Sequence, residues 1–205
     1  MHIRTTNKPF KGMHKLEFRR QLLHILYGLA LLFLHSHGII NNQILLGAII
    51  GGAIASLMIK KDKLSPIKKV LSFFERDHHL EQFPGRGILF FTIGCYLSLI
   101  LFDESIAYAG IAILTIGDAV SNVIGRHFGH IKTRLNENKF IEGNIAGIIL
   151  SFPLAYFFFP NAYAVLAAAT VGMFLEIPSI RVSEFEIDDN LLIPLGASYT
   201  LTLFT

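Results

Sequence analysis

The chain has 205 residues, of which 52% are hydrophobic and only 16% are charged. A soluble domain of this size usually carries about 25% charged residues, and the apolar residues here gather into long runs instead of amphipathic stripes. The composition therefore excludes an ordinary soluble domain and indicates an integral membrane protein. We attribute the net charge of +3 to membrane topology and contact with anionic lipid, not to nucleic-acid binding.

The apolar residues form seven runs along the chain. Several runs reach the roughly 17–20 residues that a helix needs to cross a bilayer, and polar or small flanks can extend the shorter ones. The sequence therefore predicts an all-α, polytopic transmembrane helical bundle of about seven spans, folded as a single domain over residues 1–205. The runs cover residues 22–34, 44–59, 87–102, 105–124, 144–159, 163–177 and 191–204.

The basic residues give the predicted orientation. All 18 lysines and arginines lie before the first run or after the second, fourth or sixth run, and the alternate connections, HSHGIINN, FDE and FPN, contain none. Because basic loops stay in the cytoplasm, the N-terminus (1–21) and the connections 60–86 and 125–142 are expected there. No small-residue cleavage site follows the first run, which we interpret as an anchor and not as a removed signal peptide. The expected location is a membrane, the cell membrane in a prokaryote.

Two ionisable residues lie at the cytoplasmic end of the first run, in EFRRQLLHILYG. Arg20 and His24 are one helical turn apart and share a face. Arg20 could equally be a basic membrane anchor or a functional residue. His24 lies one turn inside the run, where ionisable side chains rarely face lipid, so a functional role is favoured for it.

The connection 60–86 holds two further patterns. In SPIKKVLSFF, apolar residues recur at helical spacing beside several lysines, which predicts an amphipathic helix lying on the membrane. Glu75 and His79 have the i, i+4 spacing of a metal site, but no third ligand is well placed, so we interpret them as part of a solvated face. The single cysteine, Cys95, excludes a disulfide framework.

An acid interrupts the fourth run, in GDAVSNVIGRHFGHIK. Asp118 is expected on the cytoplasmic half of this span, and carboxylates inside spans usually face a partner or a wet cavity. The alternative is a packing salt bridge to Arg126 or Lys132. Polar and small residues at i+3, i+4 and i+7 share its face; they are Ser121, Asn122 and Gly125.

The connection after this run combines glycines, a lysine and a second acid. Gly125, Gly129 and Lys132 have a spacing that frees backbone N–H groups and adds a point charge, as in phosphate-binding loops. Glu142 follows at the mouth of the next run, in IEGNIAG. An acid on each side of a basic loop indicates a divalent cation with a polyphosphate, because Mg²⁺ is commonly held by one or two carboxylates plus substrate phosphates.

The stretch from GDAVSNVIGRHFGHIK to NKFIEGNIAG resembles the signature of the CTP-dependent lipid-alcohol kinases, the family of dolichol kinase, phytol kinase and the yeast-type diacylglycerol kinase. Phe140 departs from this signature, because the family usually has serine or threonine there. The positions that match are Gly117, Asp118, Ala119, Ser121, Gly125, Gly129, Lys132, Asn138, Lys139, Glu142, Gly143 and Ala146.

Three other motifs of the family have counterparts, so the resemblance extends from residue 17 to about 195. The opening E-x-x-R-K-x-x-H motif is similar to EFRRQLLH, where Gln21 replaces the usual lysine. The R-G-x-x-x-F-x-x-G motif contains Arg86. The D-N-L-x-x-P-L motif contains Asp189 and Asn190, for which helix capping and membership of the site are equally favoured.

The resemblance implies transfer of the γ-phosphoryl group of CTP to the hydroxyl of a membrane lipid alcohol. It does not select the alcohol, and we favour an isoprenoid alcohol over diacylglycerol. Asp118 and Glu142 would hold Mg²⁺ or Mn²⁺, and Lys132 and Lys139 would neutralise phosphate oxygens. The expected partners are CTP, the lipid alcohol and the bilayer, with no nucleic acid. The remaining implied site residues are Arg20, His24, Arg86, Gly117, Ser121, Asn122, Gly125, Gly129, Asn138, Gly143, Asp189 and Asn190.

Two rival functions remain at this stage. A CTP-dependent phosphatidate cytidylyltransferase would also be a multi-pass, Mg²⁺-dependent enzyme, but its K-R-x-x-x-x-K-D run is not found in the sequence. A small transporter could use Asp118 as a coupling carboxylate, although it would more typically show paired broken helices in two halves.

Overall fold

The computed structural model describes residues 10–61, 63, 65–75, 77–178, 181–182 and 185–205. Every apolar run lies in a helix, so the all-helical prediction is confirmed for these residues, apart from one short antiparallel pair of strands. The elements are α1 (Phe10–Ser36), α2 (Asn42–Lys60), α3 (Ser65–Leu71), α4 (Asp77–Gln82), α5 (Arg86–Leu101), α6 (Glu104–Ala112), α7 (Ala119–Phe128), α8 (Ile141–Phe158), α9 (Ala162–Leu175), β1 (Arg181–Val182), β2 (Phe185–Glu186) and α10 (Asp189–Thr202).

Three stretches of helix are long and apolar enough to cross a membrane. They are α2, the continuous helical stretch from Glu104 to Phe128, and α8, whereas α5 and α9 are apolar but shorter. Within the described residues the candidate membrane spans therefore number three by length and composition. The seven-span bundle and its orientation stay predictions.

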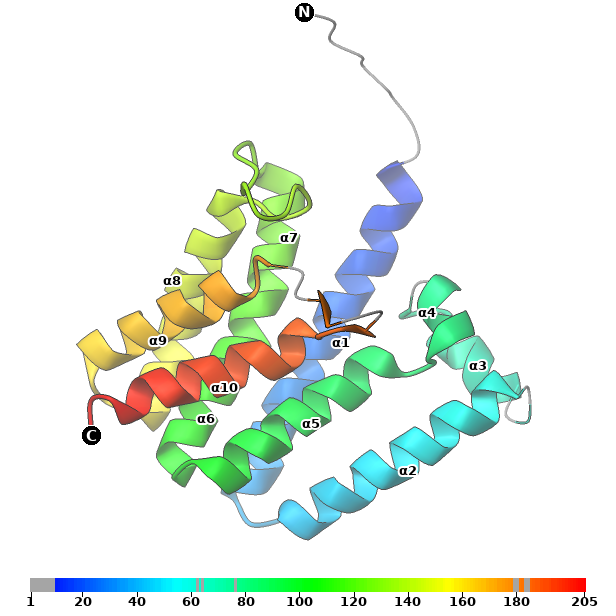
Figure 1. The fold of residues 1–205 in the computed structure, drawn as a ribbon, viewed down its shortest axis with the longest axis horizontal. Coiled ribbons are helices and arrows are strands. Elements are labelled where there is room, and N and C mark those ends of the chain that lie inside the picture. Colours follow the sequence, from blue (N-terminus) through cyan, green and yellow to red (C-terminus); the bar gives the residue numbers. More distant parts are fainter. Residues whose placement is uncertain (1–9, 62, 64, 76, 179–180, 183–184) are drawn as a thin grey trace, which may run out of the picture.

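The helical stretch from Glu104 to Phe128 packs against helices on several sides. α6 contacts α5, α8 and α10, and α7 contacts α1 and α8. In Figure 1, α2 lies at the periphery of the bundle, where it packs against α5. The stretch buries Ile111 and Leu114 completely, beside Phe91 of α5 and Met173 of α9. A helix that is covered all round needs apolar residues all round, which explains why residues 105–117 include no charged side chain.

Between α6 and α7 the helix widens into a π-helical segment, η1, over Ile113–Asp118. Thr115 Oγ1 donates to the carbonyl oxygen of Ile111 at 2.7 Å, a back-bond of the kind that often bends helices. π-helical turns are rare and frequently lie at functional sites. The sequence predicted a regular α-helix here, so the π-helical segment that ends at Asp118 was not anticipated.

Gly143 allows α8 to cross α7 at close range. A Cβ at this position would lie 2.4 Å from the backbone oxygen of Ser121 and 2.9 Å from the Cα of Gly125. We expect Gly143→Ala to force the two helices apart, at a cost of about 1–3 kcal/mol, and to lower the Tm of the purified protein in detergent.

Gly51→Ala in α2 is the matched control, because a Cβ there would meet nothing within 4 Å. Its Tm should be unchanged or slightly higher, since alanine favours the helix over glycine. An unchanged Tm for Gly143→Ala would contradict the close contact between α7 and α8.

Candidate active site

A cavity of about 600 Å³ lies between α1, α5, η1, α7 and the segments that follow α7 and α9. It brings together nine of the site residues implied by the sequence: Arg20, His24, Arg86, Asp118, Asn122, Asn138, Lys139, Asp189 and Asn190. The other implied residues are not among those that line it: Gly117, Ser121, Gly125, Gly129, Lys132, Glu142 and Gly143.

Asp118 is buried at the end of η1 and has two neighbours in the cavity. Asn122, one turn later in α7, donates from Nδ2 to the Asp118 carbonyl oxygen at 2.9 Å and to its Oδ1 at 2.8 Å. His24 of α1 places Nδ1 3.8 Å from the Asp118 Oδ2. Arg126, the packing partner considered from the sequence, pairs with Glu17 across 3.7 Å.

Glu176 is a buried acid of the cavity that sequence reasoning missed. It follows α9 directly, and its side chain is fully buried. Its Oε1 accepts hydrogen bonds from Ser121, Asn122 and Lys139, whereas its Oε2 is buried with no hydrogen-bond partner among the described residues. The signal was available, because Glu176 is an acid inside the apolar run 163–177, as Asp118 is in its own run.

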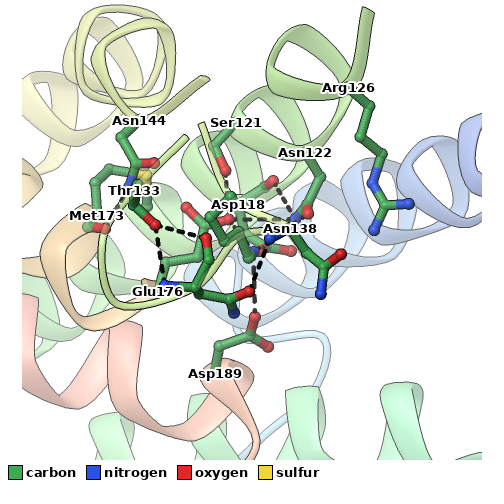
Figure 2. A network of polar contacts seen from close by, with 12 residues as sticks. Asp118, Ser121, Asn122, Arg126, Thr133, Asn138, Asn144, Met173, Glu176 and Asp189 are labelled. Carbon is green, nitrogen blue, oxygen red and sulfur yellow. Dashed lines mark hydrogen bonds and ion pairs between the residues drawn. The ribbon is translucent and has the colours of Figure 1, made fainter. Parts of the chain in front are cut away.

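Lys139 carries positive charge into this cluster from the segment after α7. Its Nζ donates to the Glu176 Oε1 and to the Asn122 Oδ1, the latter at 3.2 Å, and lies 3.7 Å from the Asp189 Oδ2. Burial lowers the pKa of Lys139, but Glu176, Asp189 and Asp118 raise it by more, and the net pKa lies above its usual value. The ammonium group therefore stays charged. Figure 2 shows Asp118, Asn122, Glu176 and Asp189 close to one another.

The sequence left two roles open at the start of α10, helix capping and membership of the site. In the structure Asp188 has the first position and Asp189 the second. Asp188 caps the helix, because its Oδ1 accepts from the backbone N–H of Asn190 at 3.2 Å and from the Asn190 Nδ2 at 2.7 Å. Its Oδ2 accepts from Arg86 Nε at 3.2 Å. Asp189 faces Lys139 instead, so the cap is the residue before the one proposed and Asp189 lies in the cavity.

Glu142 lies outside the cavity lining. Its Oε1 accepts from the backbone N–H groups of His130 and Ile131, both at 3.0 Å. Two amides directly after the glycine-containing stretch that the sequence assigned to phosphate are thus occupied by the protein's own carboxylate. Gly129 likewise donates its N–H to the carbonyl oxygen of Gly125 at 3.0 Å, and Lys132 is exposed.

Glu75 corrects one interpretation of the connection 60–86. It was assigned to a solvated face, but its side chain is buried, lines the cavity and accepts from the backbone N–H of Gly85 at 2.9 Å. The reason is local: Gly85 adopts a left-handed φ of 79° before α5, and its N–H turns toward the carboxylate. The side chain of His79 lies outside the described residues. The helix predicted from SPIKKVLSFF is confirmed as α3.

The donor set suits a magnesium-type cation that arrives with phosphates. Among the described side chains, no group of three or more His, Cys, Asp or Glu residues is arranged to hold a metal ion. Mg²⁺, however, prefers oxygen ligands and usually takes one or two carboxylates, with substrate phosphates and water completing its shell. Asp118 and Glu176, which share Asn122 as a hydrogen-bond partner, supply carboxylates of this kind. The Oε2 of Glu176 has no hydrogen-bond partner in the described part of the chain and could serve as an oxygen ligand.

Asp188 should make the stability of the protein depend on pH. Burial and the neighbouring Asp189 raise its pKa to about 7, against hydrogen bonds from Asn190 and the charge of Arg86 that lower it. Because the unfolded pKa is about 3.9, the folded chain holds this proton more tightly. The contribution of Asp188 to the free energy of unfolding should therefore decrease as pH rises from about 4 to about 7.

The measurement is the Tm of wild type and Asp188→Asn in detergent between pH 4 and pH 8. The Tm of wild type should fall relative to that of Asp188→Asn over this window. Glu104→Gln, at an exposed position in the first turn of α6, should parallel wild type. A wild-type Tm that rises relative to Asp188→Asn would contradict the raised pKa.

The fold and the cavity indicate a helical membrane protein with a buried, charged site. Comparisons with known proteins indicate which kind of membrane protein the chain is similar to. The chain is 28% identical over 189 residues to a protein of Methanocaldococcus jannaschii whose name states no function, covering 90% of this chain and 92% of that protein. It is 26% identical over 138 residues to probable phytol kinase 1 of Glycine max, covering 58% of this chain and 44% of the kinase. It is 23% identical over 139 residues to CTP-dependent diacylglycerol kinase 1 of Schizosaccharomyces pombe, covering 60% of this chain and 62% of the kinase.

These similarities confirm the resemblance to the CTP-dependent lipid kinases, at modest identity. The chain spans less than two thirds of the length of each of the two kinases just compared. No family model and no solved structure matches it.

Proposed function

We propose that this chain is a membrane-embedded kinase that transfers the γ-phosphoryl group of CTP to the hydroxyl of a lipid alcohol. The observation that carries the proposal is the meeting of Asp118, Glu176 and Lys139 in one cavity, within a chain that is similar to lipid kinases. Phosphoryl transfer needs mainly positioning and neutralisation of charge, and buried charged groups around a cavity can supply both.

The nucleotide phosphates are proposed to bind on the basic side of the cavity. Arg20, Arg86, Arg126 and Lys139 all line it, and they come from different parts of the chain. Lys139 is held charged by its carboxylate neighbours, so it can neutralise phosphate oxygens as a point charge. CTP as the donor is supported by the CTP-dependent relatives. Mg²⁺ or Mn²⁺, bound by carboxylates together with the phosphates, would supply further neutralisation of the charge on the transferring group.

The acceptor hydroxyl is proposed to bind next to His24 and Asp118. His24 Nε2 lies 3.2 Å from the carbonyl oxygen of Leu114, which can only accept, so Nε2 carries the hydrogen and Nδ1 is left to take a proton. The hydroxyl oxygen bonds to the γ-phosphorus, its proton passes to His24 Nδ1, and the bond to the β-phosphate breaks to release CDP. Asp118 Oδ2, 3.8 Å from Nδ1, would stabilise the imidazolium that forms.

An apolar flank of the same cavity supports a lipid as the acceptor. Side chains of α1, α5 and the region of α3 form it beside His24: Leu23, Tyr27, Leu71, Phe74, Ile88 and Phe91. A hydrocarbon tail against these side chains would remain out of water while its hydroxyl reaches the polar side. We favour an isoprenoid alcohol over diacylglycerol, and an active site on the cytoplasmic face of a multi-pass protein.

The test is an acceptor panel with purified protein in detergent micelles. The protein is incubated with γ-labelled CTP and one of phytol, a long-chain polyprenol or diacylglycerol, with γ-labelled ATP as the donor control. We expect label from CTP in a lipid phosphate, with more in an isoprenoid alcohol than in diacylglycerol. Absence of label from every alcohol, under conditions where CTP binds, would contradict the proposal.

A further inference from the structure

The carboxylates of the cavity outnumber the cations that contact them. Glu176 and Asp189 form ion pairs with Lys139, and Asp118 joins the same cluster through Asn122, whose Nδ2 donates to both Asp118 and Glu176. Three carboxylates therefore lie in a cluster that contains one ammonium. Among the described residues, Lys139 is the only lysine or arginine that forms an ion pair with Glu176 or Asp189, and none forms one with Asp118. A further cation is therefore expected to bind favourably beside these carboxylates.

Two buried oxygen atoms of this region also have no partner. Glu176 is 2% exposed, and its Oε2 makes no hydrogen bond within the part of the chain that the structure describes. The same holds for the Oδ1 of Asn190, which lines the cavity next to Asp189. A buried oxygen without a donor costs about 1–3 kcal/mol, so such atoms in a native fold call for a ligand, and both atoms are acceptors that a hard cation prefers.

We infer that Asp118 and Glu176, with Asp189 beside them, form the divalent-cation site of the proposed kinase, and that Lys139 occupies its place when no cation is bound. This inference rests on the proposed function and deepens it by replacing Glu142 as the second carboxylate. Glu142 is satisfied by the backbone N–H groups of His130 and Ile131 and does not line the cavity.

Removal of the Lys139 side chain should distinguish a cation site from a purely structural ion-pair network. If the carboxylates served only to hold the lysine, removing it would leave a site that is merely destabilised. If Lys139 stands in for the cation, removing it should strengthen cation binding, because a competing charge leaves and three carboxylates remain. On binding of a nucleotide with its cation, the ammonium would turn to the phosphates.

Binding of Mn²⁺ tests the inference without reference to catalysis. The loss of the free Mn²⁺ signal in electron paramagnetic resonance is titrated with the purified protein in detergent, with and without CDP. We expect Glu176→Gln to weaken binding at least about tenfold and Glu142→Gln, the matched control, to change it less than about twofold. Lys139→Met should bind Mn²⁺ more tightly than wild type in the absence of CDP.

The outcomes separate the cation site from the kinase activity. Wild-type affinity in Glu176→Gln, or loss of binding in Glu142→Gln, overturns the inference even if lipid is phosphorylated. If Glu176→Gln does not fold, Lys139→Met decides, and affinity no greater than that of wild type overturns the inference. Mn²⁺ binding that depends on Glu176, in a protein that phosphorylates no lipid alcohol, supports the cation site and contradicts the proposed function instead.

Discussion

Asp118→Asn is expected to lower the rate of phosphoryl transfer at least about 10³-fold, which corresponds to about 4 kcal/mol of transition-state stabilisation. The substitution removes the charge that faces His24 Nδ1 and one of the carboxylates proposed for the cation. The fold should survive, because the Oδ1 of an asparagine can still accept the hydrogen bond from Asn122 Nδ2. The measurement is kcat with γ-labelled CTP, together with the Tm of the same preparation.

Asp103→Asn is the matched control for Asp118. It makes the same change at the exposed N-cap position of α6, where the side chain makes no capping hydrogen bond. Its kcat should equal that of wild type within about twofold, as is usual for exposed positions without special contacts. Retention of full activity in Asp118→Asn would remove Asp118 from the site.

Lys139→Met should have the second large effect, raising the KM for CTP and lowering kcat/KM at least about 100-fold, a loss of about 2.7 kcal/mol. The reason is the loss of the one ammonium that the carboxylate cluster holds charged inside the cavity. The Tm should fall as well, because Glu176 loses a buried ion-pair partner. Lys139→Arg keeps the charge and should recover part of the affinity for CTP.

Lys132→Met tests whether Lys132, which follows Gly125 and Gly129, binds the phosphates instead of Lys139. The side chain of Lys132 is exposed and outside the cavity lining, so kcat/KM should stay within about twofold of wild type. A large loss in Lys132→Met with a small one in Lys139→Met would show that the phosphates bind over the glycine-containing stretch and not in the cavity.

The sequence predicted the helices because their signal is local. Runs of apolar residues require helix wherever backbone groups leave water, and each run appears as one. Arg20, His24, Asp118, Lys139 and Asp189 were singled out because charged groups within or beside apolar runs are expensive unless they meet partners. The structure brings these five residues to one cavity, and their roles stay predictions.

The contacts between distant segments could not be predicted in the same way. Glu176 has the local signature of Asp118, yet its importance depends on Lys139, 37 positions earlier, reaching the same point. Glu142 was assigned to the cation because it flanks the basic loop, whereas it turns back to the amides of His130 and Ile131. The π-helical segment that ends at Asp118 has no sequence pattern as clear as a proline kink.

The rival functions make different predictions about which phosphorus atom of CTP is transferred to the lipid. A cytidylyltransferase would move the α-phosphorus of CTP to a lipid phosphate and release pyrophosphate, and a transporter would move neither phosphorus. A lipid-alcohol kinase moves the γ-phosphorus alone.

The most direct measurement therefore compares α-labelled and γ-labelled CTP in parallel, with wild type, Asp118→Asn and a long-chain isoprenoid alcohol in detergent micelles. We predict that label enters the lipid from γ-labelled CTP only, with CDP as the other product, and that Asp118→Asn transfers none. Label in the lipid from α-labelled CTP, or equal transfer by wild type and Asp118→Asn, would contradict the assignment of this cavity to a lipid-alcohol kinase.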